Sequence, residues 1–312
     1  MIVVWGALDD PPVSHVLNTL RTRGAEVLHL DRARVGALDF DVTLDREATG
    51  WIALDGKRIP LDTISAMYLR PEAQQGGRAT STTACLLAIA SILDAVVVNR
   101  PAAGRSNLTK PFQLAAISDA GLTVPPTLVT TDPAAARQFV DRHGRVVYKS
   151  ISGIRSIVAT LDATDADRLS GVSTGPVQLQ RWIEGIDVRV HVVGTQWFAT
   201  AIECAATDYR YAGSADDKMA IIATDIDREL GDRLVRLAAS MGLLVAGIDL
   251  RLTPDDEWFC FEVNPSPGFT FYEDATGQQI AAAVCDLLMN AGASERRTQR
   301  NLDSAPRSLI DS

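Results

Sequence analysis

The sequence has few cysteines and histidines, and neither type is grouped. Its four cysteines are scattered with no Cys-x-x-Cys pair, and its four histidines show no metal-ligand spacing. This distribution argues against a zinc site or a disulfide framework, and it is typical of reduced thiols in a cytosolic protein. No Ser-His-Asp or Cys-His set stands out, so the sequence gives no support for a triad hydrolase.

Positive charge and long apolar runs are also scarce. The 30 Lys and Arg residues are outnumbered by 39 Asp and Glu residues, giving a net charge of -9 and a pI near 5.0. We therefore expect no nucleic-acid partner, because such surfaces are normally basic. No apolar run approaches the roughly 20 residues of a membrane span. The start, MIVVWGALDDPP, lacks the basic and long apolar regions of a signal peptide, so we expect a cytoplasmic protein.

What is present is enough apolar material for a large core. The chain has 312 residues, of which 46% are hydrophobic, and this suffices for two or three lobes. A short apolar strand at Ile2–Trp5, a helix that Gly24 ends, and a strand at Val27–Leu30 follow one another. This order predicts a parallel sheet. Further on, Trp51–Pro60 predicts a hairpin around its Asp-Gly pair.

Three lobes and a tail are expected along the chain. They are an N-terminal α/β lobe, a small central α+β lobe, a larger C-terminal α+β lobe and a polar, disordered tail, at residues 1–104, 105–185, 186–290 and 291–312. Within the third lobe we expect a hairpin around Gly194-Thr195, a mobile polar loop over Thr207–Ala223 and a closing helix over Thr276–Met289.

The stretch Trp258–Glu273, WFCFEVNPSPGFTFYE, carries the clearest functional signal. Its first half predicts a strand, which the prolines and glycine end. Glu262 and Asn264 lie two apart and so share a strand face. An upstream strand carries Asp249 as an isolated acid, and a hairpin turn would bring it close to both. Such oxygen donors suit Mg²⁺; ordinary polar hairpin ends are the alternative for Glu262 or Asn264 taken singly.

The segments AGIDLR and FEVNPSPGF resemble the C-terminal metal-binding segment of the ATP-grasp superfamily, on its RimK-like side. The resemblance extends over Asn107–Met289 through several ordered motifs. It implies a three-lobe ATP-grasp architecture of α/β and α+β class, with an N-terminal pre-ATP-grasp α/β lobe. It also implies ATP and Mg²⁺, expected as two ions with Mn²⁺ able to substitute, held by Asp249, Glu262 and Asn264.

Two lysines match the nucleotide-binding positions of the family. Lys149 ends the strand VVYKS, and a lysine beside Ser152 and Gly153 suits phosphate neutralisation, with backbone N–H groups adding to the cradle. The family loop is usually richer in glycine, and Arg155 could supply charge instead. Lys110 precedes the GLTVPPT segment and matches the earlier nucleotide lysine. For either lysine in isolation, an exposed side chain is the alternative.

The segment QRWIE resembles the strand that leaves the small lobe, where family members hold adenine through backbone groups. An adenine edge needs one donor and one acceptor, and a strand backbone supplies both; a plain buried strand is the alternative. The residues concerned are Gln180, Arg181, Trp182, Ile183 and Glu184.

The segment DVRVHVVG that follows resembles the Asp-x-Arg motif of RimK-like enzymes. The resemblance implies that Glu184 or Asp187 binds ribose and that Arg189 binds the phosphate or acyl-phosphate region. An ordinary ion pair between Asp187 and Arg189 or a cross-strand neighbour is the alternative.

Arg210 opens the expected polar loop and resembles the loop arginine of RimK-like and graspetide-type ligases. An arginine there can stabilise the charge that develops on a phosphoryl group leaving ATP. Lys218 is a weaker candidate, a solvated charged loop is the alternative, and we expect the loop to close over ATP. Arg70 and Glu72, at a strand end of the N-terminal lobe, are candidates for contact with the acceptor substrate.

Together these implications indicate an ATP-dependent carboxylate–amine ligase. A substrate carboxylate would take the γ-phosphate, giving ADP and an acyl phosphate, and an amine would then displace phosphate to form an amide. One alternative is a graspetide-type ligase that cross-links a ribosomal precursor peptide by ester or amide bonds, because NPSPGFTFYE resembles that group. A second is a non-catalytic, nucleotide-binding regulatory relative. The expected partners are amino acid or peptide substrates and a second copy in a homodimer.

Overall fold

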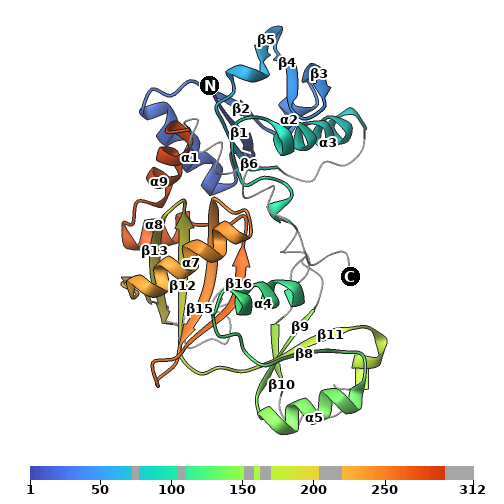
Figure 1. The fold of residues 1–312 in the computed structure, drawn as a ribbon, viewed down its shortest axis with the longest axis vertical. Helices are drawn as coiled ribbons and strands as arrows, with labels where there is room; N and C mark the ends of the chain where they lie inside the picture. Colours follow the sequence, from blue (N-terminus) through green and yellow to red (C-terminus); the bar gives the residue numbers. More distant parts are fainter. Residues whose placement is uncertain (72–76, 105–109, 151–157, 162–169, 204–219, 292–312) are drawn as a thin grey trace.

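The computed structural model describes residues 1–71, 77–104, 110–150, 158–161, 170–203 and 220–291, and these form three lobes stacked along the long axis (Figure 1). The N-terminal lobe is built on a parallel four-stranded sheet in the order β2-β1-β6-β7. Its elements are β1 (Ile2–Gly6), α1 (Pro11–Thr22), β2 (Val27–Leu30), α2 (Arg32–Val35), β6 (Ala66–Arg70), α3 (Gly77–Ile92) and β7 (Val96–Val98). The predicted parallel sheet is confirmed.

A small antiparallel sheet is attached to this lobe. It consists of β3 (Asp39–Leu44), β4 (Ala48–Leu54) and β5 (Lys57–Pro60), with β4 in the middle. Asp55 (φ 52°) and Gly56 (φ 77°) form the turn between β4 and β5. Positive φ at both positions is what a tight hairpin turn of this kind requires, so the Asp-Gly prediction is confirmed.

The small lobe is an antiparallel sheet covered on one face by a helix. The sheet order is β10-β9-β11-β8, and α5 packs on the face that carries Val146 and Leu179. Asp132 accepts a hydrogen bond from Ala134 N (2.8 Å) and so caps α5. The elements are β8 (Thr127–Thr130), α5 (Pro133–His143), β9 (Val146–Ser150), β10 (Val158–Leu161) and β11 (Val177–Arg181).

The C-terminal lobe is a five-stranded antiparallel sheet in the order β14-β13-β12-β15-β16. Helices α4 and α7 pack against one face of it through Ile117 and Leu234. The expected hairpin around Gly194 is present, and the last residues of the expected polar loop belong to β14 instead. The elements are α4 (Lys110–Asp119), β12 (Ile186–Val193), β13 (Gln196–Glu203), β14 (Ala220–Thr224), α7 (Arg228–Ser240), β15 (Val245–Leu252) and β16 (Trp258–Asn264).

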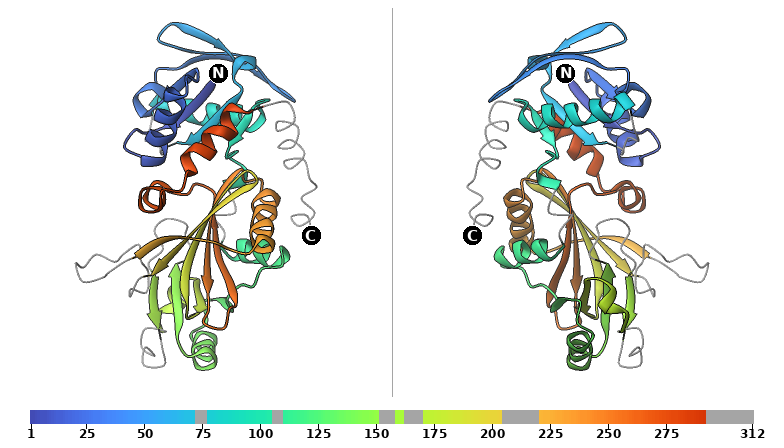
Figure 2. Two further views of the ribbon diagram at one scale, coloured as in Figure 1. Left: turned by 90° about the vertical axis from the view of Figure 1, so that its left-hand side faces the viewer. Right: turned by 90° about the vertical axis from the view of Figure 1, so that its right-hand side faces the viewer.

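The chain returns to the N-terminal lobe after β16. The helix expected over Thr276–Met289 is present but begins later, as α9 (Ile280–Met289), and a short helix that was not expected, α8 (Thr270–Thr276), precedes it and ends at Gly277 (φ 71°). Glycine adopts this left-handed conformation without steric cost. Helix α9 lies beside α1, and both helices share an apolar cluster with the parallel sheet (Figure 2). The core of the N-terminal lobe is therefore completed by the C-terminal end of the described chain.

Asn99 joins the N-terminal lobe to the C-terminal sheet. Its Nδ2 donates to Val245 O and Pro265 O, each at 2.6 Å. Its Oδ1 accepts from Leu244 N (2.8 Å) and Val245 N (3.1 Å). Both ends of the amide are used, so one side chain fixes the start of β15 and the loop that follows β16 relative to β7.

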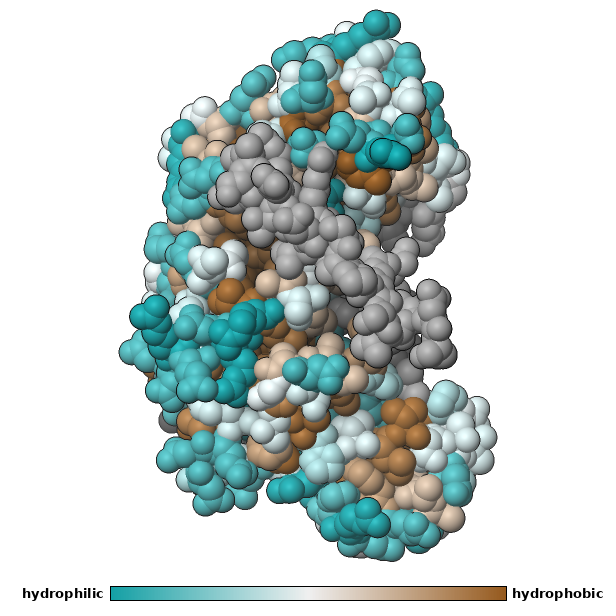
Figure 3. Space-filling view, in the orientation of Figure 1, coloured by the Kyte–Doolittle hydropathy of each residue, from teal (hydrophilic) through white to brown (hydrophobic). Residues whose placement is uncertain are grey.

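Hydrophobic residues appear on the face shown in Figure 3 as separate patches among hydrophilic ones. Among the described residues, no helix is long and apolar enough to cross a membrane.

We expect Asn99→Ala to loosen the junction between lobes. The change leaves several partly buried backbone groups without partners, at a cost of roughly 3 kcal/mol. Thermal unfolding should show a Tm lower by about 5 °C. Asn18→Ala, at an exposed position on α1, is the matched control and should leave the Tm nearly unchanged. An equal Tm for the two variants would contradict a joining role for Asn99.

Candidate functional site

The register of the β15–β16 hairpin brings the three predicted metal ligands onto one face. Asp249 pairs with Glu262, and Gly247 pairs with Asn264. Directly opposed residues of an antiparallel pair share a face of the sheet. The register shifts next to Asp249, where Phe261 is the additional residue of a bulge. Bulges re-aim neighbouring side chains and are frequent beside functional sites.

Strand β12 adds an arginine to the same face. Arg189 pairs with Asp249 across the β12–β15 ladder, and its Nη1 donates to Asp249 Oδ1 at 2.6 Å. The Arg189 residue is only 5% exposed. A Cβ atom on Gly247 would lie 2.0 Å from Arg189 Nη2. Glycine at this position therefore makes the space that the guanidinium occupies.

The donor set fits a hard divalent cation. Two carboxylates and one amide oxygen on a single face are ligands of the kind that Mg²⁺ prefers. Among the described residues, no three His, Cys, Asp or Glu side chains are grouped closely enough to hold a metal ion. The third protein ligand would thus be the Asn264 amide oxygen, which also accepts a hydrogen bond from Ser266 N (2.9 Å).

Neither cysteine nor histidine beside this face is suited to bind the ion. Burial, with a further contribution from Asp249, raises the pKa of the Cys260 thiol well above its usual value, so it stays protonated. His191 is fully buried, with its ring against Tyr272 and its Nε2 3.3 Å from Gly268 O. Burial and the neighbouring Arg189 hold the pKa of His191 well below 6.5. His191 is therefore neutral and structural, in line with its interpretation from the sequence.

The face of the small-lobe sheet opposite α5 carries polar side chains. Lys149 Nζ donates to Gln180 Oε1 at 2.8 Å, and Gln180 Nε2 donates to Thr127 Oγ1 at 3.1 Å. Lys149 Nζ also lies 5.7 Å from the ring centre of Phe261, the bulge residue of β16. The predicted nucleotide lysine therefore lies beside the metal-ligand strand.

The exit of the small lobe is bordered by an aromatic ring between two arginines. Arg145 and Arg251 place their Cζ atoms 4.1 Å and 4.9 Å from the centre of Trp182. Arg251 Nη1 donates to Ile183 O (2.7 Å). Within the described part of the chain, Ile183 N has no hydrogen-bond partner. A free backbone donor at this position suits the expected adenine edge.

Asp187 is paired with a residue that the sequence interpretation did not single out. Arg251 donates to Asp187 Oδ1 from both Nε (2.8 Å) and Nη2 (2.6 Å). The signal was present in the sequence, because Arg251 lies two positions after Asp249 on a predicted strand. A ribose contact by Asp187 or by exposed Glu184 stays a prediction, as does the adenine contact at Arg181.

Several predicted residues lie outside the described part of the chain. These are Glu72, Ser152, Gly153, Arg155, Arg210 and Lys218. Lys110 begins α4, and its side chain is likewise not described. The structure therefore leaves their assigned roles as predictions.

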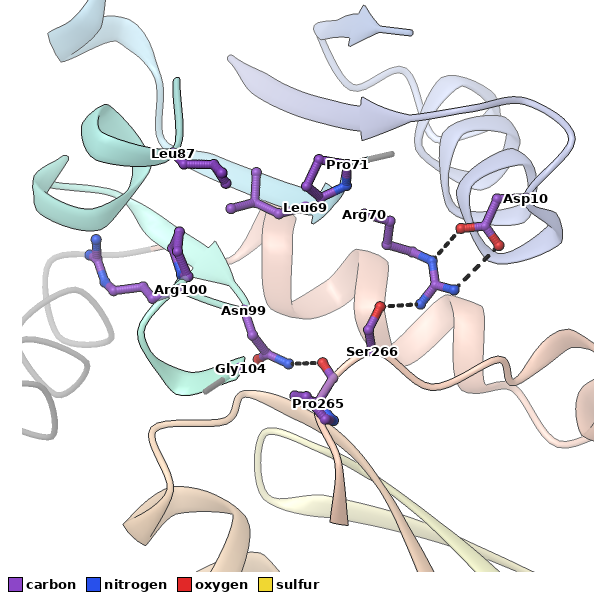
Figure 4. Close-up of a pocket in the computed structure, with 11 residues that line it drawn as sticks. Asp10, Leu69, Arg70, Pro71, Leu87, Asn99, Arg100, Gly104, Pro265 and Ser266 are labelled. Atoms are coloured by element: carbon purple, nitrogen blue, oxygen red, sulfur yellow. Dashed lines mark hydrogen bonds and ion pairs between the residues drawn. The ribbon is translucent and has the colours of Figure 1, made fainter. Parts of the chain in front are cut away.

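A cavity of about 510 Å³ lies between the N-terminal lobe and the loop after Asn264 (Figure 4). It borders the carboxyl ends of β1 and β6, which are neighbours in the sheet. After β1 the chain continues to β2 on one side, and after β6 it continues to β7 on the other side. Such crevices are the usual ligand sites of open α/β sheets. Its lining includes Asp10, Leu69, Arg70, Pro71, Leu87, Asn99, Pro101, Pro265 and Ser266.

Arg70 holds the wall of this cavity. Its guanidinium is paired with Asp10, and its Nη1 donates to Ser266 Oγ (2.8 Å) and Pro267 O (3.0 Å). Burial lowers the pKa of Arg70, but the Tyr68 phenol group and the Asp10 carboxylate together raise it by more, so the guanidinium stays charged. Arg70 thus fixes the loop next to Asn264, a predicted metal ligand; direct contact with an acceptor stays a prediction.

We expect the buried, neutral His191 to make stability depend on pH. The unfolded chain takes up a proton on this ring below about pH 6.5, whereas the folded chain does not. The contribution of His191 to the free energy of unfolding is therefore present above about pH 6.5. It falls as the pH is lowered further, by up to about 1.4 kcal/mol per pH unit. His191→Gln should flatten this fall.

Urea unfolding at about pH 7.5 and about pH 5.5 measures the effect. The same substitution at His15, which is only partly buried, is the control. An unchanged pH dependence in His191→Gln would show that the ring is protonated in the folded protein.

Comparison with known proteins identifies the family and the fold. A RimK-like ATP-grasp domain model matches residues 107–288. Among curated proteins, a probable alpha-L-glutamate ligase of Aliivibrio fischeri is 27% identical over 194 residues. That alignment covers 59% of this chain and 64% of the relative, so the chain spans slightly less than two thirds of its length.

Solved structures match over nearly the whole chain. The ATP-grasp ligase PsnB, complexed with a phosphomimetic variant of a minimal precursor, Mg and ADP, is 31% identical with a TM-score of 0.79. This match covers 93% of this chain and 98% of PsnB. A Chryseobacterium gregarium RiPP-associated ATP-grasp ligase shares the fold, with a TM-score of 0.78 at 22% identity. The expected fold and family are confirmed, and the chain belongs to the RimK-like ATP-grasp family.

Proposed function

We propose that the protein is an ADP-forming ligase that activates a carboxylate of a peptide substrate and joins it to an amine or hydroxyl group. The observation that carries the proposal is the shared face of Asp249, Glu262, Asn264 and Arg189, with Lys149 beside it. Metal-binding oxygens, a buried arginine and a lysine are together the groups that phosphoryl transfer needs. A regulatory relative without activity would have no need to keep this set.

The chemistry has two steps. A carboxylate oxygen of the substrate attacks the γ-phosphorus of ATP, ADP leaves, and an acyl phosphate forms. The amine or hydroxyl oxygen then attacks the acyl carbon, phosphate leaves with the bonding electron pair, and the nucleophile's proton passes to a base. Both steps depend mainly on positioning and on charge stabilisation.

The chain's own residues divide these tasks. Lys149 and Arg189 would neutralise the phosphates, and the backbone at Trp182 and Ile183 would receive adenine. Asp249, Glu262 and Asn264 would hold Mg²⁺, in two sites, and Mn²⁺ would substitute for it. The bound ions screen the charge of the phosphates and orient them. Arg210 would add charge from its loop, and Lys110, Ser152 and Gly153 would contact the phosphates.

A peptide substrate is favoured by the extent of the structural match. The PsnB match includes the N-terminal lobe, whereas the glutamate-ligase match covers 59% of this chain. PsnB is complexed with the precursor peptide PsnA2 in one solved structure, and the cavity beside Arg70, of about 510 Å³, is large enough for a peptide side chain. A small amino acid acceptor is the second candidate, favoured by the curated relatives. A cytoplasmic location and a homodimer stay predictions.

Mass spectrometry of products distinguishes these substrate classes. The protein is incubated with Mg-ATP and one of two substrate mixtures, and ADP release is recorded. The first mixture contains amino acids and short acidic peptides, and the second contains a precursor-like peptide encoded beside the gene. Loss of one water from a single peptide supports the peptide ligase, and condensation of two molecules supports the amino acid ligase. Intact nucleotide binding without ADP formation in any mixture would contradict a ligase function.

Gly247→Ala tests the role of the arginine pocket. The added methyl group collides with the Arg189 guanidinium, so Arg189 must leave its place opposite Asp249. We expect substrate-dependent ADP release to fall about a hundredfold, a loss typical of removing one charge-stabilising group. Gly175→Ala, whose Cβ meets nothing within 4 Å, should retain full activity. Full activity of Gly247→Ala would show that Arg189 need not lie there.

A further inference from the structure

Among the described residues, no strand pairs with the outer edge of β16, which makes an isolated bridge between Phe259 and Thr123. β16 is the last strand of its sheet, so one row of its backbone N–H and C=O groups points away from β15. Helix α4 packs against β16. The backbone groups along the outer edge of β16 must therefore find other partners, because buried, unpaired backbone groups are costly. At Cys260 the partner is a loop carbonyl: Cys260 N donates to Thr123 O at 2.8 Å.

At Val263 the partner is a single side chain. Gln113 Nε2 donates to Val263 O at 2.6 Å, and Val263 N donates to Gln113 Oε1 at 3.0 Å. Gln113 is 2% exposed. A primary amide offers one donor and one acceptor side by side, as a peptide group does. The Gln113 side chain therefore takes the place of a hydrogen-bonded residue on a missing strand.

The contact between Gln113 and Val263 lies between two expected metal ligands. Val263 lies between Glu262 and Asn264, and its own side chain is fully buried on the opposite face. The peptide groups on either side of Val263 carry the Cα atoms of two metal ligands. Gln113 also lies one helical turn after Lys110, at the start of α4. One hydrogen-bonded amide thus fixes the metal-ligand strand to the helix that begins at the expected nucleotide lysine.

We propose that Gln113 is a positioning residue for the metal site: its amide fixes the Val263 backbone and so fixes Glu262 and Asn264 for a divalent cation. Without it the strand edge can move, and the two oxygen donors lose their common orientation. Groups that orient metal ligands typically account for 10- to 100-fold in metal affinity. The inference rests on the proposed function, because it assigns the cation to this face.

The direct test is Mn²⁺ binding in the presence of ADP, measured by electron paramagnetic resonance. Gln113→Met keeps the length of the side chain and removes both hydrogen bonds, and we expect about tenfold weaker Mn²⁺ binding. The matched control is Gln278→Met. Gln278 also binds a strand backbone, since its Nε2 donates to Ala199 O at 2.9 Å. That strand is β13, which carries no expected metal ligand. The Gln278→Met variant should bind Mn²⁺ with the same affinity as the unsubstituted protein.

Hydrogen exchange at the Val263 amide provides a second readout, and it should be faster in Gln113→Met alone. Equal Mn²⁺ affinity in Gln113→Met and Gln278→Met, with faster exchange at Val263, would overturn the inference and leave the proposed function intact. Failure of the unsubstituted protein to bind Mn²⁺ with ADP would overturn both. Should Gln113→Met not fold, Gln113→Glu replaces it. Its carboxylate retains an acceptor for Val263 N and loses the donor to Val263 O, and an intermediate loss of affinity is expected.

Discussion

The site depends on immobilising a strand that lies at the edge of its sheet. β16 supplies two of the three expected metal ligands, yet only one of its sides is paired with another strand. The other side is held by contacts from separate elements. Thr123 and Gln113 bind its backbone, Asn99 binds the carbonyl of Pro265, and Arg70 binds that of Pro267. An edge strand left without such contacts frays, and ligands on a moving strand bind a cation poorly.

Residues from all three lobes lie beside the candidate site. Two of the four backbone contacts come from the N-terminal lobe, and their acceptors lie within three residues of Asn264. Lys149 approaches from the small lobe, close to the bulge at Phe261. Arg189 comes from the neighbouring strand of the C-terminal sheet, in a space that exists because residue 247 is glycine. Backbone hydrogen bonding, a missing side chain and one partly buried ion pair thus determine the arrangement of charge.

Local patterns in the sequence predicted the parts of this arrangement that depend on near neighbours. Alternation along Trp258–Asn264 placed Glu262 and Asn264 on one face, and the short turn before it placed Asp249 opposite. Gln113 and Asn99 were not predicted, because a glutamine or asparagine amide has no local pattern and its partners are distant. Arg251 was missed although it lies two positions after Asp249 on a predicted strand. Gln113 and Val263 are 150 positions apart. The last helix was predicted to begin at Thr276, because Gly277 was not recognised as the C-cap of a separate helix, α8.

Calorimetry of ADP binding with and without Mg²⁺ tests the central claim most directly. If Asp249, Glu262 and Asn264 hold the cation that joins the protein to the nucleotide phosphates, Mg²⁺ should strengthen ADP binding. The Asp249→Asn, Glu262→Gln double variant should then bind ADP with the same affinity whether Mg²⁺ is present or absent. An equal gain from Mg²⁺ in the double variant and in the unsubstituted protein would contradict the assignment of the metal site to this face.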